Sequence, residues 1–135
     1  RVHSWLLSSR GPVGARQVPY VLRNISRGSE LATDVHLALS VAERTRGLLD
    51  WSEIREGQAL IISPCNSVHM FGMRFAIDVL FLDKAGVVVR AIEGLKPWRF
   101  TRLYLRARHT VELPPGAIAR SGTQRGDKIE LPEGL

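Results

Sequence analysis

Short runs of alternating apolar and polar residues make up much of this chain, and alternation with a period of two predicts β-strands. In residues 31–39 (LATDVHLAL), every second residue from Leu31 onward lies on one apolar face. Residues 18–24 (VPYVLRN) predict an earlier strand, which Pro19 assigns to a sheet edge or a strand start. The first part of the chain therefore predicts a β-sheet with a half-buried strand.

The middle of the chain predicts a buried strand and a hairpin. Residues 59–62 (ALII) form a continuous apolar run that ends at a Ser-Pro pair. Residues 75–82 and 87–92 are apolar runs joined by residues 83–86 (DKAG), a four-residue connection typical of β-hairpins. This hairpin is the clearest strand pair in the sequence.

The last third predicts further short elements. Residues 102–113 alternate again, and at least the later part of this segment is expected to be strand. Residues 117–121 fit a single helical turn closed by Gly122, and residues 128–131 predict a last strand.

One short α-helix is indicated at about residues 40–47. Ser40 is followed three residues later by Glu43, the spacing of a capping box, and Gly47 suits the end of the helix. Many short strands with a single short helix predict a mainly β, single-domain fold of the sandwich or barrel-like type. We expect residues 1–16 to be an N-terminal tail or arm and residues 17–135 to form the domain.

Composition adds little to this picture. The 135 residues suffice for one domain, and the lone cysteine excludes an internal disulfide. The net charge of +6 comes from 19 Lys and Arg against 13 Asp and Glu spread along the chain, which favours a solvated basic surface. No apolar run has the length of a membrane span, so we expect a soluble protein. No signal peptide is visible in a chain that begins with Arg1, and both cytoplasmic and exported locations remain open.

Several motifs in a fixed order resemble a known family. They are Arg46-Gly47-Leu48-Leu49, an apolar strand after Gly57, SVHMFGMRFAIDVLFLDKAGVVV, Leu95-Lys96-Pro97-Trp98-Arg99, VELPPGAIARSG, and Gly126-Asp127. In this order the chain resembles the DUF192 family from about residue 21 to residue 131. The resemblance implies a mainly β sandwich-type fold with a short helix in small prokaryotic proteins. It implies no activity, ligand or catalytic residue.

The resemblance also shows where this chain differs. His69 stands where the family often has tryptophan, and Ala76 stands where proline is usual before the element that contains Asp78. Cys65 and His69 therefore look like features of one branch of the family.

Asp78 lies between Ile77 and Val79, inside an apolar strand. A buried carboxylate is normally retained only with an ion-pair or hydrogen-bond partner, and we expect a structural ion pair with Arg46 and Arg74. The alternative is a site carboxylate whose pKa is shifted by burial.

Cys65 and His69 are four residues apart and allow two chemical hypotheses. Together with Asp78 they are the catalytic candidates of a Cys-His or metal-assisted hydrolase, in which imidazole would activate the thiol. In a metal site, Asp78 or His36 would supply further ligands. The favoured interpretation is a buried, apolar cysteine and a histidine hydrogen-bonded at a pocket wall, with no metal or cofactor assigned.

The favoured function is a small non-catalytic binding or accessory module for an unknown small ligand or protein partner. Its recognition groove would be formed by residues 65–74 and the loop 96–102, since methionine and loop aromatics suit adaptable binding surfaces. The ligand-binding candidates are His69, Met70, Met73, Arg74, Trp98 and Arg99.

A second alternative concerns residues 96–108. This segment carries five basic residues with interleaved aromatic residues and contains no acidic residue. Such a pattern is also used for single-stranded nucleic acid or phosphate-bearing ligands, although a solvated strand face is favoured. The sequence does not indicate the oligomeric state.

Overall fold

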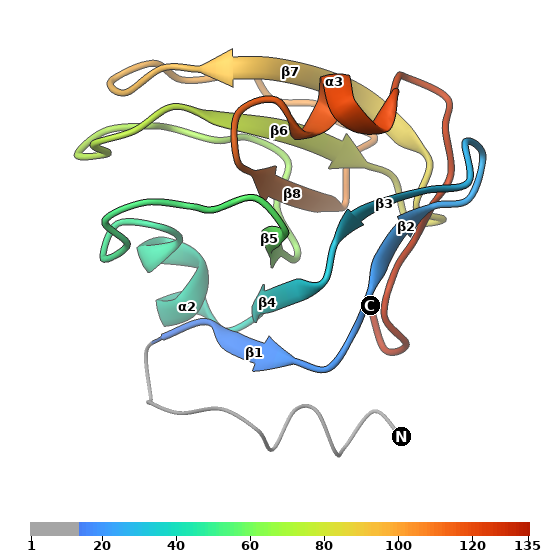
Figure 1. Ribbon diagram of the computed structural model, residues 1–135. Coiled ribbons are helices and arrows are strands. Elements are labelled where there is room, and N and C mark those ends of the chain that lie inside the picture. Colours follow the sequence, from blue (N-terminus) through green and yellow to red (C-terminus); the bar gives the residue numbers. More distant parts are fainter. Residues whose placement is uncertain (1–13) are drawn as a thin grey trace.

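The computed structural model describes residues 14–135, which form two β-sheets and two short helices (Figure 1). The larger sheet has six strands in the order β1-β4-β5-β8-β6-β7, and the smaller has the order β3-β2-β9. The strands are β1 (Arg16–Val18), β2 (Leu22–Asn24), β3 (Ser29–Ala32), β4 (Asp34–Ala38), β5 (Gln58–Ile62), β6 (Ile77–Leu82), β7 (Val88–Leu95), β8 (His109–Leu113) and β9 (Ile129–Glu130), and the helices are α2 (Val41–Arg46) and α3 (Ala117–Ser121). The prediction of a mainly β, sandwich-like fold is confirmed, and the described strands do not close into a barrel.

The six-stranded sheet is buried on both faces. One face packs against the smaller sheet and α3, as Leu22, Leu31 and Ile118 show. The other face is covered by Leu48, which follows α2 and its C-terminal Gly47, by the segment that contains Val68 and Met70, and by parts of the 96–108 segment. This double burial explains why residues 59–62 are apolar without interruption.

β8 lies in the interior of the larger sheet, between β5 and β6. Glu112 is paired with Leu60 on β5 and with Val79 on β6. Both neighbours belong to the cluster on the face that α2 covers, so Glu112 projects to that face.

The predicted capping box is present at α2. The Ser40 hydroxyl accepts a hydrogen bond from the Glu43 N–H at 3.1 Å, and the Glu43 carboxylate accepts one from the Ser40 N–H at 3.1 Å. Gly47 ends the helix with φ 52°, where its N–H donates to the Glu43 carbonyl. The hairpin β6–β7 and the helical turn α3 are also found as predicted.

Two predicted strands are each divided between the sheets. Residues 18–24 split around Pro19, so that β1 joins the larger sheet and β2 the smaller one. Residues 31–39 split at Thr33, where the N–H groups of Thr33 and Asp34 both donate to the Gly57 carbonyl. The alternation of apolar and polar residues continues through this bend of the backbone, so the sequence pattern does not show that the strand is divided there.

The expected tail lies mostly outside the described residues, and Arg16 already belongs to β1. No helix among the described residues is long and apolar enough to cross a bilayer.

Candidate binding site

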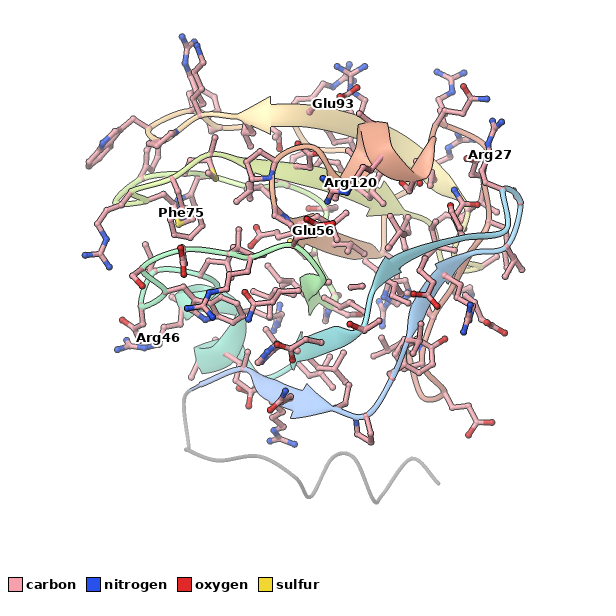
Figure 2. All side chains as sticks on the ribbon, in the orientation of Figure 1. Arg27, Arg46, Glu56, Phe75, Glu93 and Arg120 are labelled. Carbon is pink, nitrogen blue, oxygen red and sulfur yellow. The ribbon has the colours of Figure 1, made fainter. Side chains whose placement is uncertain are left out.

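A cleft of about 80 Å³ opens between the C-terminal end of α2 and the segment of residues 65–73. In Figure 2, Arg46 at the end of α2 and Phe75 just after this segment lie on the same side of the molecule. We call it the α2 cleft; its lining residues run from Arg44 to Leu49 on one side and include Cys65, Ser67, Val68, His69, Met70, Met73, Ile62 and Glu112.

Backbone contacts fix the position of the 65–73 wall. The Cys65 N–H donates to the Arg108 carbonyl at 2.9 Å, and the Thr110 hydroxyl donates to the Cys65 carbonyl at 3.0 Å. The opposite wall begins where Gly47 turns the chain, which buries Leu48 in the core.

Glu112 lines the cleft from the sheet below. Its side chain is buried between Leu60 and Val79, and the residue is only 6% exposed. Within residues 14–135, no hydrogen bond or ion pair reaches the Glu112 carboxyl group. Desolvation by burial raises the pKa of this carboxyl to about 7. The cleft therefore contains a carboxyl group that titrates near neutral pH and lacks a hydrogen-bond donor.

Arg44, which also lines the cleft, has an unmet donor. Its Nη1 donates to the Pro64 carbonyl at 3.2 Å, whereas its Nε is buried without a hydrogen-bond partner in the described part of the chain. Since buried polar groups are normally hydrogen-bonded, the unsatisfied Arg44 Nε is unusual. The Glu112 carboxyl group has no donor from the described part of the chain and keeps some contact with the open cleft.

The alternative hypothesis of a Cys-His pair is not supported by the contacts of the two side chains. The Cys65 thiol donates to the Ser67 carbonyl at 3.1 Å, and its pKa is raised chiefly by burial. The His69 side chain is exposed and stacks on Phe71, with ring centroids 5.1 Å apart. Both residues line the cleft, but imidazole does not activate the thiol.

The predicted ion pair of Asp78 is wrong. The buried Asp78 carboxylate accepts three backbone hydrogen bonds, from the N–H groups of Gly94 at 2.9 Å, Gly116 at 3.1 Å and Ile118 at 3.0 Å. These three donors satisfy the buried charge without a cation. Asp78 faces the α3 side of the sheet, opposite to the cleft.

The two proposed arginine partners of Asp78 are engaged elsewhere. Arg46 forms an exposed ion pair with Asp50 at 2.6 Å. Arg74 donates to the Trp51 carbonyl at 3.4 Å.

The structure does not assemble the proposed metal ligands. His36 lies against the Trp51 ring with centroids 4.9 Å apart, and its Nε2 is 3.1 Å from the Asp34 carboxylate. In residues 14–135, no group of three or more His, Cys, Asp and Glu side chains is placed to hold a metal ion.

The segments 65–74 and 96–102 are neighbours, as expected. The Met70 N–H donates to the Arg99 carbonyl at 2.7 Å, and the Trp98 N–H donates to the Met70 carbonyl at 2.8 Å. The loop 96–102 nevertheless does not line the α2 cleft, whose second wall is the end of α2. The prediction that both segments form the groove is therefore corrected, because their close backbone pairing leaves the opening on the other side of residues 65–73.

The ligand-binding candidates consequently divide into two groups. His69, Met70 and Met73 line the α2 cleft. Arg74, Trp98 and Arg99 lie outside it with exposed side chains. Arg44 and Glu112 were not among the predicted site residues. Alternation assigns Glu112 to the solvent side of a half-buried strand, and Arg44 fits the C-terminal turn of a helix without any role in a site. The signal available was the VELPPG motif, which contains Glu112.

Sequence and fold comparisons find related proteins. The model of the DUF192 family, described as "Uncharacterized ACR", matches residues 23–131. A UPF0127 protein of Pyrococcus furiosus is 34% identical over 114 residues, which cover 79% of this chain and 94% of the relative. A UPF0127 protein of Pyrococcus horikoshii is 42% identical over 111 residues, with coverage of 79% and 95%.

A solved structure has the same fold. The crystal structure of a protein of unknown function from Novosphingobium aromaticivorans matches with a TM-score of 0.75 and 21% identity, covering 91% of each chain. At this identity the likeness extends to the fold alone.

Proposed function

The chain belongs to the DUF192 family, and we propose that this member is a non-catalytic binding module whose α2 cleft takes a small polar ligand. The single observation that carries the proposal is the Glu112 carboxyl group, buried at the cleft without a donor in the described part of the chain. Burying a carboxyl without a partner costs stability, and a ligand that donates a hydrogen bond to it recovers part of that cost.

The ligand chemistry follows from the two unmet groups. Glu112 needs a hydrogen-bond donor, and the Arg44 Nε needs an acceptor. A primary amide supplies an N–H donor and a carbonyl acceptor within a few atoms of each other. The cleft volume of about 80 Å³ suits a group of this size, because a single water needs roughly 10–15 Å³ by the same measure. We therefore propose small amides, free or at the end of a side chain, as the ligand class.

The surroundings of Cys65 support binding over catalysis. A nucleophilic cysteine needs a lowered thiol pKa and a base within hydrogen-bond reach. Here burial raises the pKa of the thiol, and the hydrogen bond goes to the Ser67 carbonyl.

Acetamide and acetone test the proposal as matched probes, because they are similar in size but acetone has no N–H donor. Acetamide is titrated against protein labelled with ¹³C at the glutamate carboxyl carbons, and the Glu112 signal is assigned by its absence from a Glu112→Leu variant. We expect saturable movement of the Glu112 signal with a Kd on the order of 10 mM, as suits so small a ligand. Acetone should need at least about tenfold higher concentration, since it offers no donor.

A variant pair provides the control. Acetamide at about ten times its Kd should raise the free energy of unfolding of the parent by about 1.4 kcal/mol. Glu112→Leu should abolish this gain, whereas Glu93→Leu, on the exposed side of β7, should retain it. An unmoved Glu112 signal, or equal responses to acetamide and acetone, contradicts the proposal.

A further inference from the structure

We propose that a second surface of this protein, separate from the α2 cleft, binds the surface of an anionic phospholipid bilayer. The surface combines exposed apolar side chains with exposed cations, and we call it the basic–apolar face. Its apolar members are Phe71, Trp98, Phe100, Leu103 and Leu105.

The apolar members project outward because other residues of the same segment hold it against the sheet. Tyr104 packs on Phe81 with ring centroids 4.7 Å apart, and Ala107 also contacts that core cluster. Leu105 lies between these two contacts and is 87% exposed, and Trp98, earlier in the same segment, is 66% exposed. Exposed apolar side chains that lie together, as the rings of Phe71, Trp98 and Phe100 do, indicate an interaction surface.

The cations of the face are Lys96, Arg99, Arg102 and Arg106, all exposed. None of them forms an ion pair with a carboxylate in residues 14–135, although Arg102 lies 5.5 Å from the centroid of the Tyr104 ring. There is no Asp or Glu from residue 94 to residue 111 or from residue 65 to residue 74. The two segments of this face therefore carry only positive charge, and Asp83 lies beside Arg106 at its edge. The excess of positive charge complements an anionic partner.

The kinds of apolar side chain favour a bilayer over single-stranded nucleic acid. Leucine inserts into the interfacial region of a bilayer but offers no ring on which a base can stack, and Leu103 and Leu105 are both exposed. The ring of Phe71 contacts those of Trp98 and Phe100, each with centroids 6.2 Å apart, so part of the ring surface is already used. Tryptophan and phenylalanine beside basic residues are typical of membrane-surface anchoring.

Vesicle co-sedimentation of the full 135-residue chain tests the proposal. The lipids are phosphatidylcholine alone and phosphatidylcholine with about 30% phosphatidylglycerol, at low salt. We expect at least about tenfold stronger binding to the anionic vesicles, and weaker binding as salt is raised. A dT20 oligonucleotide is measured in parallel.

Two double variants separate the apolar and the charged contributions. L103Q/L105Q should weaken binding about tenfold because it removes the inserting side chains without changing charge. R99Q/R102Q should weaken it roughly thirtyfold, at about fivefold for each charge near an anionic surface. The matched controls are Ile25→Gln, at another exposed apolar residue, and Arg125→Gln, at an exposed cation elsewhere; each should stay within about twofold of the parent.

The results decide between the partners. Binding that needs phosphatidylglycerol and falls in both double variants supports the proposal. Equal binding to both vesicle types, unchanged binding of L103Q/L105Q, or oligonucleotide binding without vesicle binding overturns it. None of these outcomes depends on the α2 cleft, because every residue changed lies outside that cleft.

Discussion

Glu112 carries a carboxyl group on a strand that is buried on both faces, and this position couples the stability of the protein to pH. Burial raises the pKa of the group from 4.5 to about 7. Between these values the folded state binds more protons than the unfolded state, so the group lowers the free energy of unfolding as pH rises. Glu112→Gln removes this contribution.

We expect the free energy of unfolding of Glu112→Gln, relative to the parent, to increase by about 3 kcal/mol between pH 4 and pH 8. Urea unfolding at the two pH values measures this change. Glu30→Gln, at an exposed carboxylate, serves as the control and should show a much smaller difference. Parallel pH profiles for Glu112→Gln and the parent would contradict the assigned pKa.

The thiol of Cys65 should react slowly. Burial raises its pKa above the usual 9.0, so the thiolate population at neutral pH is small. Alkylation by iodoacetamide should therefore show an inflection above pH 9, and the profile of His69→Gln should coincide with that of the parent. An inflection below about pH 8 would restore the Cys-His nucleophile hypothesis.

At this scale the sequence indicates burial better than it indicates partners. Burial of Asp78 follows from its apolar neighbours in the strand, but its three donors come from backbone groups that are 16 to 40 residues away in sequence. No side-chain pattern marks such donors, and so arginine was the natural but wrong expectation. Burial of Glu112 was not predicted, because the pattern of one strand does not show that another part of the chain covers its polar face.

Among the elements, α3 and the end of β7 depend on Asp78. Its Oδ2 accepts from both Gly116 and Ile118 at the start of α3, and its Oδ1 accepts from Gly94 on β7. In Asp78→Asn, either orientation of the amide places an NH₂ group against a backbone N–H. We expect a loss of about 3 kcal/mol in the free energy of unfolding, measured by urea denaturation.

Asp83→Asn is the matched control for this prediction. Among the residues that the structure describes, only Oδ1 of Asp83 accepts hydrogen bonds, from the N–H groups of Ala85 and Val87. In Asp83→Asn the amide oxygen can take this place and the NH₂ group can point away from both donors. Its cost should be below about 1 kcal/mol. Amide hydrogen exchange at Gly94, Gly116 and Ile118 should accelerate in Asp78→Asn; a loss below 1 kcal/mol with unchanged exchange would contradict the role of Asp78.

Elements with local signals were predictable, and those fixed by distant contacts were not. The capping box of Ser40 and Glu43 and the hairpin around residues 83–86 involve neighbours in sequence, and both are found. At Pro19 and at Thr33 the chain passes from one sheet to the other. The positions of these breaks depend on the arrangement of the two sheets, which is set by contacts between residues far apart in sequence. The α2 cleft likewise arises from the packing of α2 beside residues 65–73, which local patterns do not encode.

Across the whole molecule, β8 separates two buried titratable groups with opposite effects. His109 projects to the face that the smaller sheet and α3 cover, where Leu82 is its neighbour, and Glu112 projects to the face that α2 covers. The pKa of His109 is lowered by burial and by the nearby charge of Arg108. Below the ordinary histidine pKa of 6.5 the unfolded state therefore binds more protons at this residue, and its contribution to stability falls as pH falls.

The two contributions should oppose each other between about pH 5 and pH 6.5, where Glu112 favours the folded state increasingly as pH falls. The pH slope of the urea midpoint in the parent should therefore lie between the slopes of the Glu112→Gln and His109→Gln variants. In Glu112→Gln only the His109 effect remains, so stability should rise with pH; in His109→Gln only the Glu112 effect remains, so it should fall. A loss of packing that lowers the stability of a variant equally at every pH shifts its whole profile but does not change the slope. If the urea midpoints of the two variants changed with pH in the same direction, the proposed opposite effects of folding on the pKa values of Glu112 and His109 would be contradicted.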